Sequence, residues 1–177
     1  MFRDDTHLGR HVIAGGNVEQ MYPAKDMIRD FERNRRLLHS MADGLDHAQS
    51  LLQPLGGNCF NWVLGHIVVH RDKVISACGG QPVLDAAQTA RYENESDPVT
   101  ADGDDVMPFD TLLRLLDESQ DRLAETVDNA DLSELQTVRD RDVPLWKRVH
   151  FWYFHDTYHA GQTELLRGLA GFSDKVI

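Results

Sequence analysis

The sequence has few cysteines, few basic residues and no long apolar run, and each shortage excludes a class of protein. No stretch reaches the roughly 18 consecutive apolar residues that a membrane-spanning helix needs. Residues 1–20 also lack the apolar centre of a secretory signal. A net charge of -11, from 18 Lys and Arg against 29 Asp and Glu, disfavours sequence-independent binding to nucleic acid. We therefore expect a cytoplasmic protein without a membrane or nucleic-acid partner.

The two cysteines, Cys59 and Cys78, are predicted to lie at opposite ends of one helix. At a rise of ~1.5 Å per residue, such a helix would hold them roughly 28 Å apart. A disulfide requires Cα atoms within about 7 Å of each other. The cysteines therefore should not pair, and a reducing compartment is the simpler inference.

The composition, with 41% hydrophobic and 27% charged residues, fits one globular domain over residues 21–177, preceded by a loose arm of residues 1–20. Apolar residues recur at steps of three and four in four segments, which is the pattern of amphipathic helices. These segments are residues 23–46, 58–78, 109–129 and 145–170. The chain is therefore predicted to be an all-α helical bundle.

The connection between the second and third helices is unusually long. It contains about 29 residues, among them Gly79 and Pro108, and is rich in glycine, proline and acids. A chain of this length can travel the ~30 Å of a bundle, which predicts a crossover between parallel helices. The shorter polar stretch 130–144 is expected to be a loop that becomes extended near Pro144.

The segment His155 to Gln162 carries most of the functional signal. His155 and His159 are four residues apart, so on a helix they share one face and can bind one metal ion. His66, on the apolar face of the second helix, is the best candidate for a third ligand. A buried imidazole without a partner loses about 1 to 3 kcal/mol, and metal ligation satisfies several at once. We predict a three-histidine site with open positions for a divalent ion, with Zn²⁺ or Ni²⁺ the leading choices.

Neighbouring residues leave alternatives open. His70 follows His66 by one turn and would either replace a ligand or lie off the site. Gln162 would orient a ligand ring or a bound water. Asp156 stands where zinc proteases have a glutamate, but its side chain is shorter, so we expect it to face solvent or to support a ligand. Tyr158 is expected in the core or an interface rather than as an acid catalyst.

The last helix is apolar on two adjacent faces. One stripe comprises Trp152, His155, His159, Gln162 and Leu166, and the other comprises Phe151, Phe154, Tyr158, Leu165 and Leu169. A helix of this kind is either central or covered by a second copy of the chain. The second stripe therefore predicts a homodimer.

Two separated motifs, Asn61 to Ile67 and His155 to Gln162, the second followed by Leu165 to Arg167, resemble the DinB-like family over residues 22–171. The resemblance implies an up-down-down-up four-helix bundle, often dimeric, with a divalent metal held by three histidines, here His66, His155 and His159. Relatives include transferases and isomerases that use low-molecular-weight thiols such as bacillithiol or mycothiol. Many members have no assigned activity.

Our leading hypothesis is a metal-dependent enzyme that activates a thiol or water for attack on a small electrophile, as a transferase or a hydrolase. A rival hypothesis is a metal-binding or stress-response module in which the ion only holds the bundle together. A helical dimer that binds a small ligand without metal is a third. Catalytic sites keep exchangeable positions in a pocket open to solvent, whereas structural sites are closed.

Overall fold

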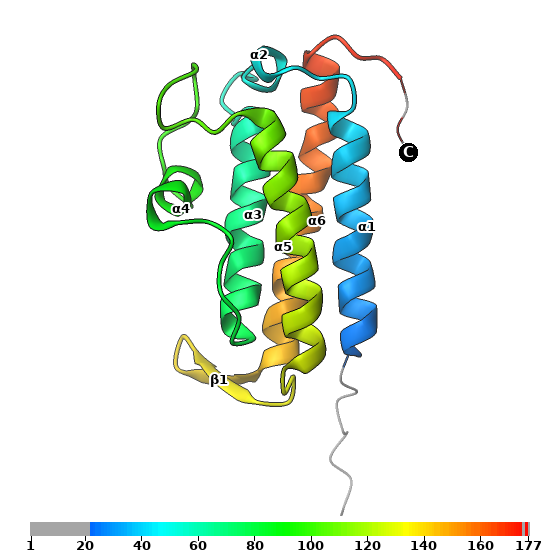
Figure 1. Ribbon diagram of the computed structural model, residues 1–177, viewed down its shortest axis with the longest axis vertical. Coiled ribbons are helices and arrows are strands. Elements are labelled where there is room, and N and C mark those ends of the chain that lie inside the picture. Colours follow the sequence, from blue (N-terminus) through cyan, green and yellow to red (C-terminus); the bar gives the residue numbers. More distant parts are fainter. Residues whose placement is uncertain (1–21, 175, 177) are drawn as a thin grey trace, which may run out of the picture.

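Four long helices dominate the structure, a computed structural model that describes residues 22–174 and 176. They are α1 (Ala24–Ala42), α3 (Phe60–Ala77), α5 (Phe109–Asn129) and α6 (Leu145–Leu169). The four lie side by side, with α1 and α6 running one way and α3 and α5 the other (Figure 1). Both α1 and α3 pack against α5 and α6. The predicted helical class is confirmed, whereas the predicted arm of residues 1–20 lies outside the described residues.

The helices follow from the apolar periodicity. In α1 the residues Met27, Phe31 and Leu38 are buried on one face, and in α5 the residues Leu112 and Leu116 are buried in the same way. Helix α3 differs because it is buried on nearly all sides over its first three turns. It packs against α5, α6 and the short helix α4 (Ala86–Tyr92), so apolar residues are favoured around its whole circumference.

Helix ends depart slightly from the sequence prediction. Helix α1 ends at Ala42, before Gly44 with φ +79° and the one-turn helix α2 (His47–Ser50). Helix α3 begins at Phe60 with Cys59 as its N-cap, two residues after the start predicted at residue 58. Asn58 lines a pocket beside the histidines.

The long connection between α3 and α5 is tied down by α4. Asp85 and Gln88 form a reciprocal capping box at its N-terminus. At its C-terminal end Tyr92 is fully buried, and its hydroxyl donates to Asn61 Oδ1 and accepts from Met107 N, both at 2.9 Å. The crossover is therefore anchored to α3 rather than running freely along the bundle.

A β-hairpin occupies most of the stretch predicted as a polar loop. Strands β1 (Leu135–Val138) and β2 (Arg141–Pro144) pair antiparallel, and β2 continues directly into α6. The expectation of a loop at 130–144 is therefore wrong, although the extended backbone near Pro144 is present.

Cys59 and Cys78 cap the two ends of α3 as free thiols. Within the described part of the chain, no helix combines the length and apolar character that a bilayer span requires.

Candidate metal centre

Four histidine rings from two helices meet at the contact between α3 and α6. The ring centroid of His66 lies 5.1 Å from that of His155 and 4.8 Å from that of His159. His70, also on α3, stacks on His155 with a centroid distance of 3.7 Å. The structure thus brings the three predicted ligands together and adds a fourth imidazole beside them.

The local cause is helical periodicity on both sides of the contact. His66 and His70 are one turn apart on α3, and His155 and His159 are one turn apart on α6. Side chains at this spacing project from one face of a helix. Because α3 packs against α6, the two pairs face each other across the contact.

The α6 pair already has the spacing of two ligands of one ion. The Nε2 atoms of His155 and His159 are 3.2 Å apart. Two Zn–N bonds of about 2.0–2.1 Å at a tetrahedral angle place their nitrogens roughly 3.3 Å apart. Without a cation, one of these nitrogens must carry a proton and donate it to the other.

Two ligand rings are held in a defined tautomer by neighbouring oxygens. His66 Nδ1 donates to the carbonyl oxygen of Tyr92 at 2.8 Å, and His159 Nδ1 donates to Gln162 Oε1 at 2.8 Å. Each ring therefore keeps its Nε2 lone pair for a ligand. Trp62 stacks on His66 at 4.5 Å with an interplanar angle of 15°, which restrains the plane of that ring.

Some of the ring nitrogens have no partner among the described residues. Both nitrogens of His70 and the Nδ1 of His155 are buried without a hydrogen bond. Leaving such groups unpaired costs about 1–3 kcal/mol each. A cation bound by His66, His70 and His155 would pair one of the His70 nitrogens, so the unpaired nitrogens fit a metal ion held by that set.

A second ligand set is geometrically available. One ligand atom each from His66, His70 and His155 lie within 4.8 Å of one another. Two ~2.1 Å bonds to one ion span at most about 4.2 Å, so this set needs small side-chain rotations before it can bind. The predicted set with His159 remains a prediction, and His70 is its competitor.

Burial keeps all four rings neutral at physiological pH. It lowers the pKa of His66 and of His155 to about 4 and that of His70 to about 2, and it lowers the pKa of His159 as well. The charged form is disfavoured because it loses hydration in the interior. Neutral imidazoles are the form that binds metal ions.

A cavity of about 460 Å³ opens onto the cluster. His66, His155, His159 and Gln162 line it together with apolar side chains such as Trp62 and Leu166. This volume suits a small molecule. A larger groove of about 760 Å³ lies between α3, α4 and α6, and its described lining contains none of the four histidines.

Two secondary expectations are each narrowed to one of their alternatives. Asp156 does not face solvent, because it is 1% exposed and its carboxylate accepts from Arg71 at 2.7 Å. Tyr158 is 58% exposed at the rim of the cavity, so it lies outside the core. Sequence reasoning also missed Tyr92, because its contact with His66 comes from a backbone carbonyl in the crossover and has no side-chain signature.

Comparison with known proteins identifies a family. A sequence profile described as the DinB superfamily matches residues 30–163, a range that includes all four histidines and Gln162. No curated protein matches the chain.

Proposed function

Because the chain belongs to the DinB superfamily, we propose that it is a metal-dependent enzyme that activates a thiol or water for attack on a small electrophile. The ligands are His66, His155 and His159. The observation that carries the proposal is the 3.2 Å spacing of the two α6 Nε2 atoms beside an open cavity. The proposed fold is the up-down-down-up four-helix bundle of this superfamily.

The ion is a divalent metal, with Zn²⁺ and Ni²⁺ the best fits to three neutral imidazoles. When bound, such an ion lowers the pKa of a thiol or water and so supplies a nucleophile at neutral pH. Three protein ligands leave positions for exchange, and the adjoining cavity gives them access to solvent.

The side chains around the ligands orient them and shape the cavity. Gln162 holds the ring of His159 through a 2.8 Å contact, and the Tyr92 carbonyl holds His66. Trp62 and Leu166 supply an apolar wall against which the carbon skeleton of a small electrophile would pack. A low-molecular-weight thiol is the proposed co-substrate of a transferase reaction, and water is that of a hydrolase reaction.

The rival is a non-catalytic metal-binding or stress-response module. A structural ion is normally enclosed by four protein ligands. Here the cavity reaches three of the histidines directly, which favours the enzyme. A metal-free dimer that binds a small ligand gives no reason for four histidine rings to gather at one contact between α3 and α6.

The proposed assembly is a cytoplasmic homodimer without a nucleic-acid or membrane partner. The free thiols of Cys59 and Cys78 suit a reducing compartment. The exposed apolar stripe of α6 is the proposed dimer surface.

Metal analysis followed by a transfer assay tests the proposal. The purified wild type is compared with His155→Ala and with a control, His150→Ala, whose ring contacts Tyr22 and Tyr153 away from the cluster. We expect one ion per chain in the wild type and in the control. In His155→Ala we expect loss of the ion, and with the ion the loss of thiol transfer to 1-chloro-2,4-dinitrobenzene or of ester hydrolysis. If His155→Ala lost the ion but turned over substrate at the wild-type rate, the proposed catalytic role of the ion would be wrong.

A further inference from the structure

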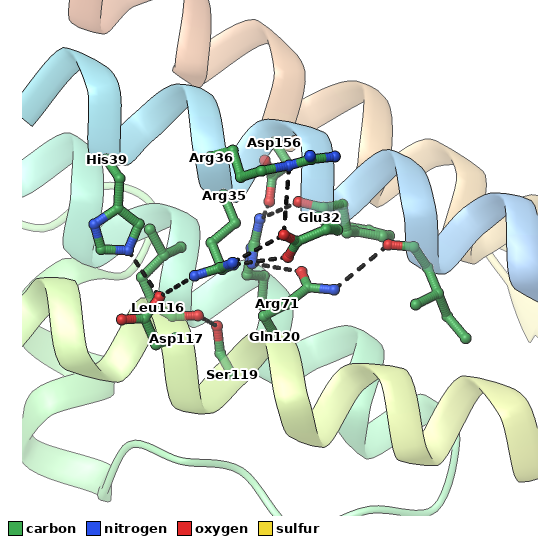
Figure 2. Close-up of polar contacts among 12 residues, drawn as sticks. Glu32, Arg35, Arg36, His39, Arg71, Leu116, Asp117, Ser119, Gln120 and Asp156 are labelled. Atoms are coloured by element: carbon green, nitrogen blue, oxygen red, sulfur yellow. Dashed lines mark hydrogen bonds and ion pairs between the residues drawn. The ribbon is translucent and has the colours of Figure 1, made fainter.

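A buried ion pair lies directly behind the histidine cluster. Arg71 on α3 is 0% exposed and Asp156 on α6 is 1% exposed. Arg71 Nε donates to Asp156 Oδ2 at 2.7 Å. Figure 2 shows both side chains within the interior of the bundle.

The pair is bonded to all four long helices. Arg71 Nη1 donates to Gln120 Oε1 on α5 at 3.1 Å, and Arg71 Nη2 donates to the carbonyl of Phe31 on α1 at 3.0 Å. Asn34, also on α1, donates to Asp156 Oδ1 at 3.0 Å. These contacts form one network across the bundle, part of which is drawn in Figure 2.

The ion pair and the metal ligands share the same turns of the same helices. Arg71 directly follows His70, and Asp156 directly follows His155. A step of one residue turns the side-chain direction by about 100° around a helix, so the pair occupies the face next to the histidines. Any slide of α3 along α6 that opened the 2.7 Å contact would also move the rings of the cluster apart.

Stability alone does not explain this pair. Removing two charges from water is costly, and well-packed apolar side chains of similar size would hold the helices together at least as well. Apolar surfaces tolerate small slips, whereas a directional ion pair fixes one register. Metal ligands need such accuracy, because they must be held within about 0.5 Å of their working geometry.

We infer that Arg71 and Asp156 are positioning residues that fix the register of α3 against α6 and so set the position of His66 relative to His155 and His159. This inference rests on the proposed metal site. It assigns a role to a pair that touches neither the cavity nor the ligand nitrogens.

A double variant separates positioning from stability. In Arg71→Met with Asp156→Leu, both charges are removed together, and Asn34 keeps its 2.8 Å contact with Thr157 Oγ1. The control is Arg35→Met with Asp117→Leu, which removes a partly exposed 2.7 Å ion pair between α1 and α5, the contact between long helices that holds none of the four histidines. Figure 2 labels both pairs. Each protein is tested for melting temperature without metal, for Ni²⁺ and Zn²⁺ dissociation constants by competition with a chromophoric chelator, and for its Co²⁺ absorption spectrum.

We expect the Arg71/Asp156 double variant to melt no lower than the control and yet to bind the ion about 10- to 100-fold more weakly, with an altered Co²⁺ spectrum. A folded double variant with wild-type affinity and spectrum would overturn the inference. If that variant does not fold, Arg71→Lys is tested in its place, because lysine keeps the charge but loses the several hydrogen bonds of the guanidinium group. We expect the same weaker ion binding and altered Co²⁺ spectrum in Arg71→Lys. A wild type that binds no ion would instead overturn the proposed function.

Discussion

At the scale of single residues, the cluster ties protein stability to pH. Burial lowers the pKa of His66 and His155 to about 4, whereas an unfolded histidine titrates near about 6.5. Between these values the unfolded chain binds more protons than the folded chain, so the free energy of unfolding rises with pH. The metal-free protein should be fully stable above about pH 6.5 and lose stability as pH falls toward about 4. Urea denaturation at several pH values in this range measures the slope. A free energy of unfolding that does not change with pH would contradict the lowered pKa values of His66 and His155.

His70 offers a sharp test of the ligand set at the same scale. Its two nitrogens are buried without partners, so His70→Leu should stabilise the metal-free protein by about 1–3 kcal/mol. If His159 is the third ligand, His70→Leu should keep nearly wild-type ion affinity, whereas His159→Ala should lose most of it. Chelator competition measures both variants. A greater loss in His70→Leu than in His159→Ala would move the site to His66, His70 and His155.

At the scale of elements, one glycine sets the distance between α3 and the crossover. A Cβ on Gly65 would lie 2.3 Å from Tyr92 Cδ1, so Gly65→Ala must displace the tyrosine that accepts from His66. We expect a loss of about 1–3 kcal/mol in the free energy of unfolding and weaker ion binding. Denaturant titration and chelator competition measure the two effects.

The control for this prediction is Gly168→Ala on α6. A Cβ there meets no atom within 4 Å, so the substitution should be neutral or stabilising, by up to about 1 kcal/mol, because alanine favours a helix more than glycine does. Equal stability of the two variants would show that the contact with Tyr92 is not a constraint.

The outer face of α6 predicts how two chains associate. Its exposed apolar residues are Phe151, Phe154, Tyr158, Leu165 and Leu169. Phe154 is 62% exposed, and Phe154→Glu would place a charge in the middle of this stripe. Sedimentation velocity should report a dimer for the wild type and a monomer for Phe154→Glu. Leu135→Glu, on β1 and equally exposed at 62%, should remain dimeric. A monomeric wild type would show that the apolar face of α6 is not a dimer surface.

Elements could be predicted from the sequence where one local pattern determines them. The long helices follow from apolar periodicity, and α5 has the predicted bounds, Phe109–Asn129. The hairpin was missed because its turn, Arg139 and Asp140 with φ +48° and +63°, uses no glycine or asparagine. Helix α4 is short and has no apolar stripe, although its Asp85 and Gln88 capping box was a readable signal.

At the scale of the whole molecule, contacts between distant segments set the limit of sequence reasoning. Spacing within α6 predicted the histidine pair, and its apolar setting pointed to His66. Nothing local to Arg71 indicates Asp156, which lies 85 positions later, and nothing near Tyr92 predicts that its carbonyl meets His66. These partners are defined by tertiary packing, because a hydrogen bond between helices has no sequence period.

The whole molecule should also respond to metal removal, because an ion that binds only the folded chain stabilises it by mass action. At a free ion concentration of 100 times the dissociation constant, the gain is about 2.7 kcal/mol. For a chain of 177 residues this corresponds to a rise in melting temperature of roughly 5–11 °C. Calorimetry of chelator-treated protein with and without added Ni²⁺ or Zn²⁺ measures the rise. His155→Ala should show none, because the ligand pair on α6 is broken, and the same rise in that variant would place the bound ion elsewhere on the chain.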